Sequence, residues 1–336
     1  MEKQKKIAIV RTDKIGDVVL TLPLVKEIIS HYPNSIVDFI VQEYTLPIVK
    51  FNQHIHKVYS IPNKLIDITK FFLNNKYDII ITVKPEFNIA FAAFLARIPV
   101  RIGTAFRLYS FLFNKKVYHH RKESKKNELE YNFELLKPLG INATPDFKNV
   151  DYGLKIPIEL QKSVAEKYLS GTIFNPNYKT IIIHPGSGKS SIDLPIYKFK
   201  ELTKLLTELN ANIIVTGNHN EREICDTISH NNVINLSGKL NLKEFTALVS
   251  FCDILISNST GPIHLAAALD KWTIGFYPLV KECSVTRWGP YTSKRIIFTP
   301  NNSQCPHNTL EQCKINKCME TISINDVYNS IVKIIR

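Results

Sequence analysis

The segment KIAIVRTDKIGDVVLTLPLVKEIISHY, residues 6–32, decides the fold class of this chain. Its first five residues, Lys6 to Val10, form a short apolar run that is typical of a buried parallel strand. Residues 11–16 are mostly polar and end in a glycine, which predicts a turn. From Asp17 to Tyr32, apolar residues recur at helical spacing. The segment therefore predicts a strand, a turn and a helix, which begin an α/β domain with parallel strands.

The same alternation continues through the chain in two series. In the first half we expect strands at 35–41, 57–61 and 78–83, and a helix at 127–139 that ends at a glycine. In the second half we expect strands at 180–184, 211–215, 233–236, 253–257 and 272–277, and helices at 195–210, 221–229, 242–251, 261–269 and 324–335. The two halves share an order of elements without a sequence repeat, which indicates a duplicated architecture.

A chain of 336 residues suits two domains. Proline and asparagine interrupt the pattern between about 145 and 178, so we place the junction there. We expect an N-terminal Rossmann-like domain at 1–155, a linker region with one helix at 156–178, and a C-terminal Rossmann-like domain at 179–321. We expect the last helix, within 322–336, to pack back on the N-terminal domain.

The charge of the chain is unevenly distributed. The net charge is +13, and residues 1–150 hold 23 Lys and Arg against 14 Asp and Glu. A basic first half suits an anionic partner, namely nucleic acid, anionic lipid or a phosphorylated substrate, although a generally basic proteome gives the same composition. No recognised nucleic-acid module is present, so we do not expect a nucleic-acid partner.

The N-terminus and the cysteines also limit the choice of protein class. The apolar run after MEKQKK is too short for a secretory signal, and no stretch approaches the length of a membrane span. We expect a cytoplasmic protein, with peripheral contact at the inner membrane as a further expectation. Six cysteines in a chain of this size predict reduced thiols. The spacing of Cys305, Cys313 and Cys318 around His307 fits no common structural zinc pattern, so we expect no metal.

Ligands of open α/β sheets bind at the loops that follow the strands. The first such loop, Arg11 to Asp17, places the Asp17 carboxylate in the first turn of a helix. An acidic residue there is often present only because it stabilises the helix N-terminus. The functional alternative is a general base that takes a proton from an acceptor hydroxyl, with Asp13 as the rival carboxylate.

The second loop, His184 to Ser191, reads HPGSGKSS. Backbone N–H groups at Ser187 and Gly188, with the charge of Lys189, suit a phosphate. The loop is not a P-loop, because the position that needs the first glycine of that motif holds Ile183. Thr216 and Gly217 follow the next strand and are expected to border the same site.

The third loop, SNSTGPIHLAAAL at 257–269, joins small polar residues at the end of a strand to a helix that begins at Gly-Pro. Such residues are good helix caps, which is one sufficient explanation for them. Free N–H groups at a helix N-terminus also favour a diphosphate. Together with the second loop, this one predicts a nucleotide-diphosphate site with the candidate residues Ser259, Thr260, Gly261, Pro262 and His264.

Three stretches together resemble the ADP-heptose:lipopolysaccharide heptosyltransferases of glycosyltransferase family nine. They are IAIVRTDKIGDVVLTLPLVKEI at the start, IIIHPGSG followed by LPIYKF in the middle, and ISNSTGPIHLAAALD, the most specific, near the end. Their order and spacing are similar to those of the family, and the resemblance covers nearly the whole chain. The resemblance implies the GT-B fold, in which two Rossmann-like α/β/α domains face each other across a cleft.

The resemblance also implies an activity. It implies an inverting, metal-independent and cofactor-free glycosyltransferase that moves a heptose or a related sugar from an ADP-sugar to a lipopolysaccharide-core or similar glycan acceptor. Asp17 would be the general base, the C-terminal domain would bind the donor, and the N-terminal domain would bind an anionic lipid-linked acceptor. Candidate acceptor contacts are Arg11, Lys14, Arg97, Arg101, Arg107 and Arg121, with Lys115, Lys116 and Lys122 beside them.

Two positions depart from the family pattern. Ile192 stands where the family often has lysine, and Ser259 where it often has aspartate. Both positions concern donor recognition more than base catalysis. Three alternatives remain open at this point: a GT-B transferase that uses another nucleotide sugar, a nucleotide-sugar epimerase, and a non-catalytic sugar-nucleotide binder.

Overall fold

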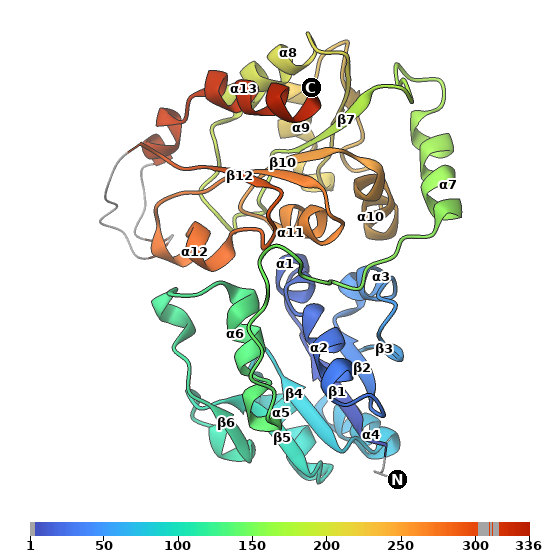
Figure 1. Cartoon of the computed structure of the whole chain (residues 1–336), viewed down its shortest axis with the longest axis vertical. Helices are drawn as coiled ribbons and strands as arrows, with labels where there is room; N and C mark the ends of the chain where they lie inside the picture. The colour runs from blue at the N-terminus through green and yellow to red at the C-terminus, as the bar shows by residue number, and fades with distance from the viewer. Residues whose placement is uncertain (1–3, 302–308, 310, 312–315) are drawn as a thin grey trace. The chain divides into compact units, whose positions relative to one another are not determined.

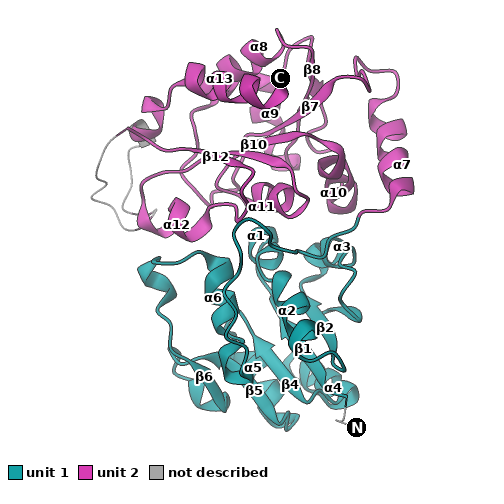
Figure 2. Cartoon of the chain, viewed as in Figure 1, with its two compact units in different colours: residues 1–155 teal, residues 156–336 magenta. Residues whose placement is uncertain are grey.

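The computed structural model describes residues 4–301, 309, 311 and 316–336, and residue contacts divide the chain into two compact units (Figures 1 and 2). Unit 1 spans Met1–Lys155 and unit 2 spans Ile156–Arg336. Among the helices of the described residues, none is both long and apolar enough to cross a membrane.

Unit 1 is built on a six-stranded parallel sheet with the order β3-β2-β1-β4-β5-β6. The central strand, β1, is apolar on both faces because helices cover both sides of the sheet, and it pairs with β2 and β4. The strands are β1 (Lys6–Val10), β2 (Ile36–Val41), β3 (Lys57–Ser60), β4 (Ile79–Thr82), β5 (Val100–Thr104) and β6 (Lys115–Val117).

Helices lie on both faces of this sheet (Figure 1). On one face, α4 and α5 pack side by side against Ala8, Val10, Ile40 and Ile80 of the strands. A second set includes α2, which contacts β2, and α6, which begins with a capping box between Asn127 and its third residue. The helices are α1 (Ile15–Val19), α2 (Pro23–His31), α3 (Leu46–Val49), α4 (Leu65–Asn75), α5 (Phe87–Leu95) and α6 (Glu128–Glu134), with 3₁₀ turns at Glu43–Thr45, Ser110–Leu112, Arg121–Glu123 and Lys137–Leu139.

The expected helix from Asp17 to Tyr32 is divided in two. Helix α1 ends at Val19, and α2 begins at Pro23. Between them the backbone N–H groups of Thr21 and Leu22 bond three residues back instead of four. Proline has no N–H to continue the α-helical ladder but suits the first turn of a helix, so Pro23 starts a new one.

Unit 2 repeats the architecture of unit 1. Its parallel sheet has the order β12-β11-β10-β7-β8-β9, in which the first strand of the unit, β7, again lies centrally. Numbered from its own start, this unit has the same strand order as unit 1, which is the order of dinucleotide-binding domains. The strands are β7 (Lys179–His184), β8 (Ala211–Val215), β9 (Ile234–Asn235), β10 (Ile254–Asn258), β11 (Trp272–Phe276) and β12 (Arg295–Phe298).

The helices of unit 2 also lie in two sets. Phe199 of α8, Ile228 of α9 and Ile331 of α13 share one core with the strands, whereas α10 contacts α7 and α11. The helices are α7 (Ile158–Leu169), α8 (Ile196–Leu206), α9 (Arg222–Ile228), α10 (Leu242–Phe251), α11 (Gly261–Ala268), α12 (Val285–Trp288) and α13 (Ile324–Ile335), with 3₁₀ turns at His219–Glu221, Lys281–Cys283 and Asn316–Thr321.

The last helix differs from expectation in its packing. The sequence analysis expected it to return to the N-terminal domain, but α13 packs against α8 of unit 2. Its apolar face, with Ile324, Val327 and Ile331, is buried in the core that also contains Leu202 and Leu206. A helix whose apolar stripe is buried in this way belongs to the unit whose core it completes.

We predict that Ile331→Ala lowers the free energy of unfolding of unit 2 by about 2–5 kcal/mol, because it removes a fully buried side chain from that core. Urea denaturation followed by circular dichroism measures the change. The control is Lys333→Ala on the exposed side of the same helix, which should alter stability by less than about 0.5 kcal/mol. Equal midpoints for the two variants would contradict the placement of α13.

Candidate functional site

The guanidinium group of Arg11 organises the carboxyl edge of the unit 1 sheet. Arg11 directly follows β1 and is only 3% exposed. Its Nε lies 2.8 Å from an oxygen of Asp13, its Nη1 donates to Glu128 at 3.1 Å, and its Nη2 donates to Asp17. Burial alone would lower the pKa of the guanidinium, but the three carboxylates raise it, so Arg11 stays charged.

The two candidate base residues therefore share one cation. Asp17 is the third residue of α1, and both carboxylates keep partial exposure while Arg11 beneath them does not. Burial, and to a lesser extent the Asp17 charge, raise the pKa of Asp13 to about 6 against the attraction of Arg11. Tyr44 completes the loop by donating to the Asp13 carbonyl at 2.8 Å. Both carboxylates are thus held at the surface in a fixed geometry.

Helix α6 supplies the other side of this network. Glu128, which is 1% exposed, accepts hydrogen bonds from both Arg11 and Arg121. Asn132, one turn later, accepts from Arg121 at 3.1 Å and donates to the carbonyl of Leu20 at 3.0 Å. The helix that sequence alone marked as ordinary therefore joins the first loop to the segment after β6.

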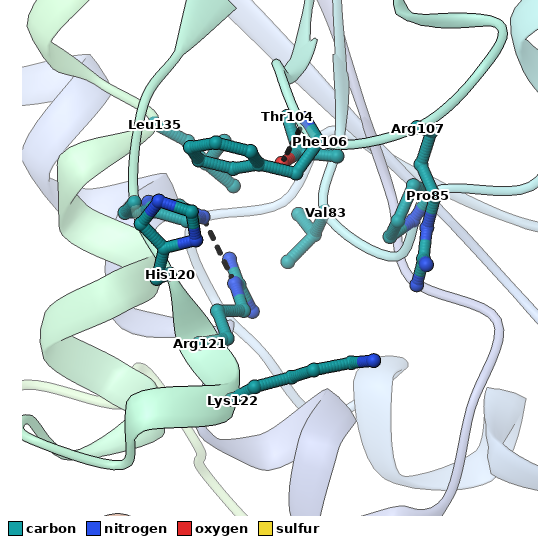
Figure 3. Close-up of a pocket in the computed structure, with 10 residues that line it drawn as sticks. Val83, Pro85, Thr104, Phe106, Arg107, His120, Arg121, Lys122 and Leu135 are labelled. Carbon is teal, nitrogen blue, oxygen red and sulfur yellow. Dashed lines mark hydrogen bonds between the residues drawn. The ribbon is translucent and has the colours of Figure 1, made fainter.

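A basic pocket lies on the same network (Figure 3). It is formed where β4, β5 and β6 end, and in the view of Figure 3 the charged ends of Arg107, Arg121 and Lys122 lie around Val83. Arg121 Nε donates to His119 Nε2 at 3.0 Å, and the Nδ1 of that imidazole lies 3.1 Å from Glu134. The lining residues are Val83, Pro85, Thr104, Phe106, Arg107, His119, His120, Arg121, Lys122 and Leu135.

The charge of this pocket comes from guanidinium and ammonium groups and not from His119. Burial, and to a lesser extent the nearby Arg121 charge, lower the pKa of His119 to about 4, while Glu134 opposes the shift. The imidazole is therefore neutral at pH 7, with Nδ1 as donor to Glu134 and Nε2 as acceptor from Arg121. Such a pocket can bind an anion such as a phosphate or carboxylate.

The structure separates the six predicted acceptor contacts. Arg107 and Arg121 line the pocket, and Lys14 is exposed beside Asp13. Arg11 differs from the expectation, because its guanidinium is buried and already paired with carboxylates of its own unit. It orients the site instead of presenting a free cation.

Arg97 and Arg101 also differ from the expectation. They lie just before and near the start of β5, at the opposite end of the strand from Arg107. The guanidinium of Arg101 donates to the carbonyls of Ile98 at 2.6 Å and Leu112 at 2.8 Å. Closeness in sequence did not predict closeness in space here, because β5, a strand of five residues, separates Arg97 and Arg101 from Arg107 along its length.

In unit 2 the second loop leaves β7 in an unusual backbone conformation. Gly188 and Lys189 both have positive φ, 56° and 63°, and Lys189 is exposed. Ser190 closes the turn, since its N–H and hydroxyl both bond to the carbonyl of Ser187. Successive residues of this kind turn backbone N–H groups toward one side and favour an anion. At Gly186 a Cβ atom would lie 2.0 Å from the carboxylate of Glu221, so any larger residue would displace that side chain.

Asn258, the last residue of β10, joins the second and third loops. Its side-chain oxygen accepts from the N–H of Leu194 at 2.9 Å, and its amide nitrogen donates to the carbonyl of Pro185 at 2.6 Å. The hydroxyl of Ser190 also lies 3.4 Å from the carbonyl of Ser259. Ser187, Gly188, Lys189, Ser259 and Thr260 are thereby brought to one edge of the sheet, as the sequence predicted for adjacent parallel strands.

Other predicted donor residues lie in the same region. Thr216 directly follows β8 and precedes Gly217, and its hydroxyl lies 3.1 Å from Nδ1 of His184. Gly261 and Pro262 are the first two residues of α11, and His264 lies in its first turn. Burial lowers the pKa of His264 to about 4, and within the described part of the chain its Nδ1 has no hydrogen-bond partner.

The two positions that differ from the family pattern, Ile192 and Ser259, are both buried. Ile192 is 4% exposed and packs in the core of unit 2. Ser259 is also buried and follows Asn258. Neither residue adds a charge to this site. The charged groups at the loop include Lys189, Glu221 beside Gly186, and Asp193, whose pKa burial raises to about 6.

The cysteine cluster is only partly described. Cys305, His307 and Cys313 lie outside the described residues, while Cys318 is half-buried. Among the residues that are described, no group of three His, Cys, Asp or Glu side chains is placed to hold a metal.

Sequence reasoning missed Glu128, Asn132 and Asn258. Glu128 looked like an ordinary acidic residue in a first helical turn, and nothing local shows that it is buried between two arginines. Asn258 offered a better signal, because an asparagine at the end of an apolar strand must satisfy both ends of its amide when buried.

We predict that Glu128→Gln lowers the free energy of unfolding by up to about 3–5 kcal/mol, because it leaves Arg11 and Arg121 with less negative charge in a buried site. Chemical denaturation measures the effect. Glu123→Gln is the matched control, since Glu123 pairs with Lys125 in an exposed setting and should change stability by less than about 1 kcal/mol. A Glu128 variant as stable as the control would show that the buried network contributes little.

Three comparisons place the chain among known proteins. A putative glycosyltransferase of Haemophilus influenzae is 26% identical over 340 residues, which cover 95% of this chain and 96% of the relative. The solved structure of E. coli ADP-heptose lps heptosyltransferase II has a TM-score of 0.82 at 18% identity and covers 99% of this chain and 98% of its own. E. coli heptosyltransferase WaaC with ADP-2-deoxy-2-fluoro heptose has a TM-score of 0.68 at 21% identity, with 98% and 99% covered.

The likeness to these solved structures shows a shared fold, GT-B, as the two repeated sheets indicated. The family is established separately, because the family model described as glycosyltransferase family 9 (heptosyltransferase) matches residues 66–319, well over half of the chain. The protein is therefore a glycosyltransferase, and it belongs to glycosyltransferase family 9, the heptosyltransferase family.

Proposed function

We propose that this enzyme transfers a heptose from ADP-heptose to an anionic acceptor of the lipopolysaccharide core, with inversion at the anomeric carbon and without a metal. The observation that supports it most is the pair of carboxylates, Asp13 and Asp17, held at the carboxyl edge of the unit 1 sheet by one buried arginine. Family membership supports the class of reaction, and the titles of the similar E. coli structures support the donor.

The proposed step is a direct displacement. Asp17 accepts the proton of an acceptor hydroxyl while the hydroxyl oxygen forms its bond to the anomeric carbon. The bond between that carbon and the diphosphate oxygen breaks, and the electron pair leaves with ADP. Arg11 orients Asp17, because its guanidinium donates a hydrogen bond to that carboxylate.

The proposed donor site is the edge of the unit 2 sheet. N–H groups in the turn at Ser187 to Lys189 and at the start of α11, Thr260 and Gly261, would take up the charge that develops on ADP. The Lys189 ammonium adds a mobile positive charge. Fixed dipoles of this kind can stabilise a departing diphosphate without a metal, and this motivates the metal-free proposal.

The proposed acceptor site includes the basic pocket of unit 1. Arg107, Arg121 and Lys122 suit a phosphate or a sugar carboxylate on the acceptor. Through Glu128, Arg121 belongs to the same ion-pair network as Asp17. An acceptor bound there would thus have its anionic group on the network that orients the base.

We predict that Asp17→Asn lowers kcat by about 10²–10⁴-fold and leaves ADP binding unchanged, because the proton acceptor in unit 1 is lost while ADP is proposed to bind in unit 2. The matched control is Asp67→Asn, which removes an acidic residue at the same position in the first turn of α4. A control with full activity shows that the loss does not arise from the helix terminus alone.

The rival base is tested by pH dependence. If Asp13 were the base, kcat/KM would fall as the pH is lowered through about 6, where its carboxylate becomes protonated. Asp13→Asn would then abolish activity as severely as Asp17→Asn. An active Asp13→Asn variant with an inactive Asp17→Asn variant assigns the base to Asp17, and the reverse result moves it to Asp13.

The donor is identified by calorimetric titration with ADP, UDP, GDP and ADP-heptose in the presence of EDTA. We predict binding of ADP and ADP-heptose alone. Preference for UDP or GDP would keep the reaction class but give Ile192 and Ser259 a role in selecting another sugar nucleotide. A requirement for added Mg²⁺ would contradict the metal-free proposal.

A further inference from the structure

The segment from Phe87 to His120 differs from the rest of unit 1 in composition. Its 34 residues include five Lys and Arg and no Asp or Glu. The same segment holds seven of the large apolar side chains that are exposed in the described structure. They are Phe87, Phe94, Leu95, Phe106, Leu108, Phe111 and Tyr118, which we call the apolar patch.

Helix α5 contributes the first part of the patch. Eight of its nine residues are apolar, and Asn88 is the exception. Its inner face, with Ile89 and Ala92, is buried against the sheet, whereas Phe87 and Phe94 are about half-exposed on the outside. A helix that is apolar all round is normally covered on all sides by protein or lipid.

The segment between β5 and β6 contributes the second part, and it is held firmly. The ring of Phe113 is buried against Gly103, where a Cβ atom would lie only 2.6 Å away. Ser110 donates to the carbonyl of Thr104 at 2.7 Å and accepts from the N–H of Arg107 at 3.0 Å. The loop therefore presents Leu108 and Phe111, 100% and 72% exposed, from an ordered base.

The two parts are neighbours. The ring of Phe87 lies 5.6 Å from that of Tyr109 and stacks on Phe91 at 5.4 Å. Phe91 and Tyr109 pack together over Leu112 and Phe113. The exposed side chains of α5 and of the loop thus belong to one surface.

Positive charge borders this surface. Arg97 follows α5, Arg107 precedes Leu108, and Lys116 lies on the edge strand β6, all with exposed side chains. The neighbouring carboxylate, Glu86, is paired with Lys84. Apolar side chains beside basic ones fit the surface of an anionic bilayer, where rings and leucines enter the headgroup boundary and cations meet phosphates. We propose that the apolar patch of unit 1 docks on an anionic lipid membrane.

Charge argues against the other occupant, a second copy of this chain. A two-fold interface would place the same patch on both subunits and bring the positive charges of Arg97, Arg107 and Lys116 on one subunit near those on the other. An anionic lipid surface neutralises these groups instead. The role of this docking rests on the proposed function: it would bring the basic pocket close to a lipid-linked acceptor. Arg107 connects the two features, because it lines the pocket and borders the patch.

Vesicle sedimentation tests the proposal with the full chain. We expect binding to vesicles that contain phosphatidylglycerol, weakened by high salt, and little binding to vesicles of phosphatidylcholine alone. The double variant Leu108→Ser with Phe111→Ser should lose at least about tenfold in vesicle affinity, because two large apolar side chains are removed.

The matched control is the double variant Ile66→Ser with Leu73→Ser on α4, where both side chains are comparably exposed, at 58% and 50%, outside the patch. It should bind vesicles as the parent protein does. Equal loss in both variants, no binding by the parent protein, or equal binding to both lipids would overturn the proposal. Analytical ultracentrifugation tests the alternative. If the parent protein and the control variant were dimers and the patch variant a monomer, the patch would be assigned to contact with a second copy.

Sugar transfer is measured separately. Turnover with a short acceptor that carries no lipid should be the same for the patch variant and the parent protein. A parent protein that binds vesicles but transfers no sugar would refute the proposed function and support the membrane-docking proposal. A parent protein that transfers sugar but does not bind vesicles would refute the membrane-docking proposal and support the proposed function.

Discussion

The buried charge of Arg11 is the constraint on which the functional edge of unit 1 depends. A guanidinium that is 3% exposed must be surrounded by acceptors, and Asp13, Asp17 and Glu128 provide them. These carboxylates come from the first loop and from α6, more than a hundred residues later. The need to neutralise one cation therefore fixes the positions of segments that are distant in sequence.

The same constraint extends to the basic pocket. Glu128 is shared with Arg121, and Arg121 in turn orients His119 against Glu134. Each of these groups is stable in its position because its neighbour carries the opposite charge or a matching hydrogen-bond role. The pocket and the carboxylates thus form one network within unit 1, which suits a proposed site that must bind an anion and remove a proton nearby.

In unit 2 the loops that follow the strands are held together by neutral groups instead of charges. Asn258 and Ser190 join the loops after β7 and β10 through amides and hydroxyls, and the backbone turn at Gly188 and Lys189 orients N–H groups. Such dipoles are neutral groups and need no counter-charge of their own. They favour an anion when it arrives, which fits the proposed binding and release of a nucleotide diphosphate.

The sequence by itself determined the two α/β series, most strand positions, and the three loops on which the candidate residues lie. It did so because buried parallel strands are continuous apolar runs and because glycine, proline and small polar residues mark the turns after them. The family resemblance in the second and third loops agrees with the family match, which covers residues 66–319. Pro23, which divides the first helix, was visible but was not given its full weight.

Only the tertiary structure decided which charges meet. Arg97, Arg101 and Arg107 are close in sequence, yet they lie at opposite ends of β5, and Arg11, expected at the surface, is buried beneath Glu128. The packing of α13 on α8 was likewise not visible in its amphipathic pattern. Local patterns report which face of an element is apolar, but the partner of that face, or of a buried charge, is set by contacts between segments far apart in the chain.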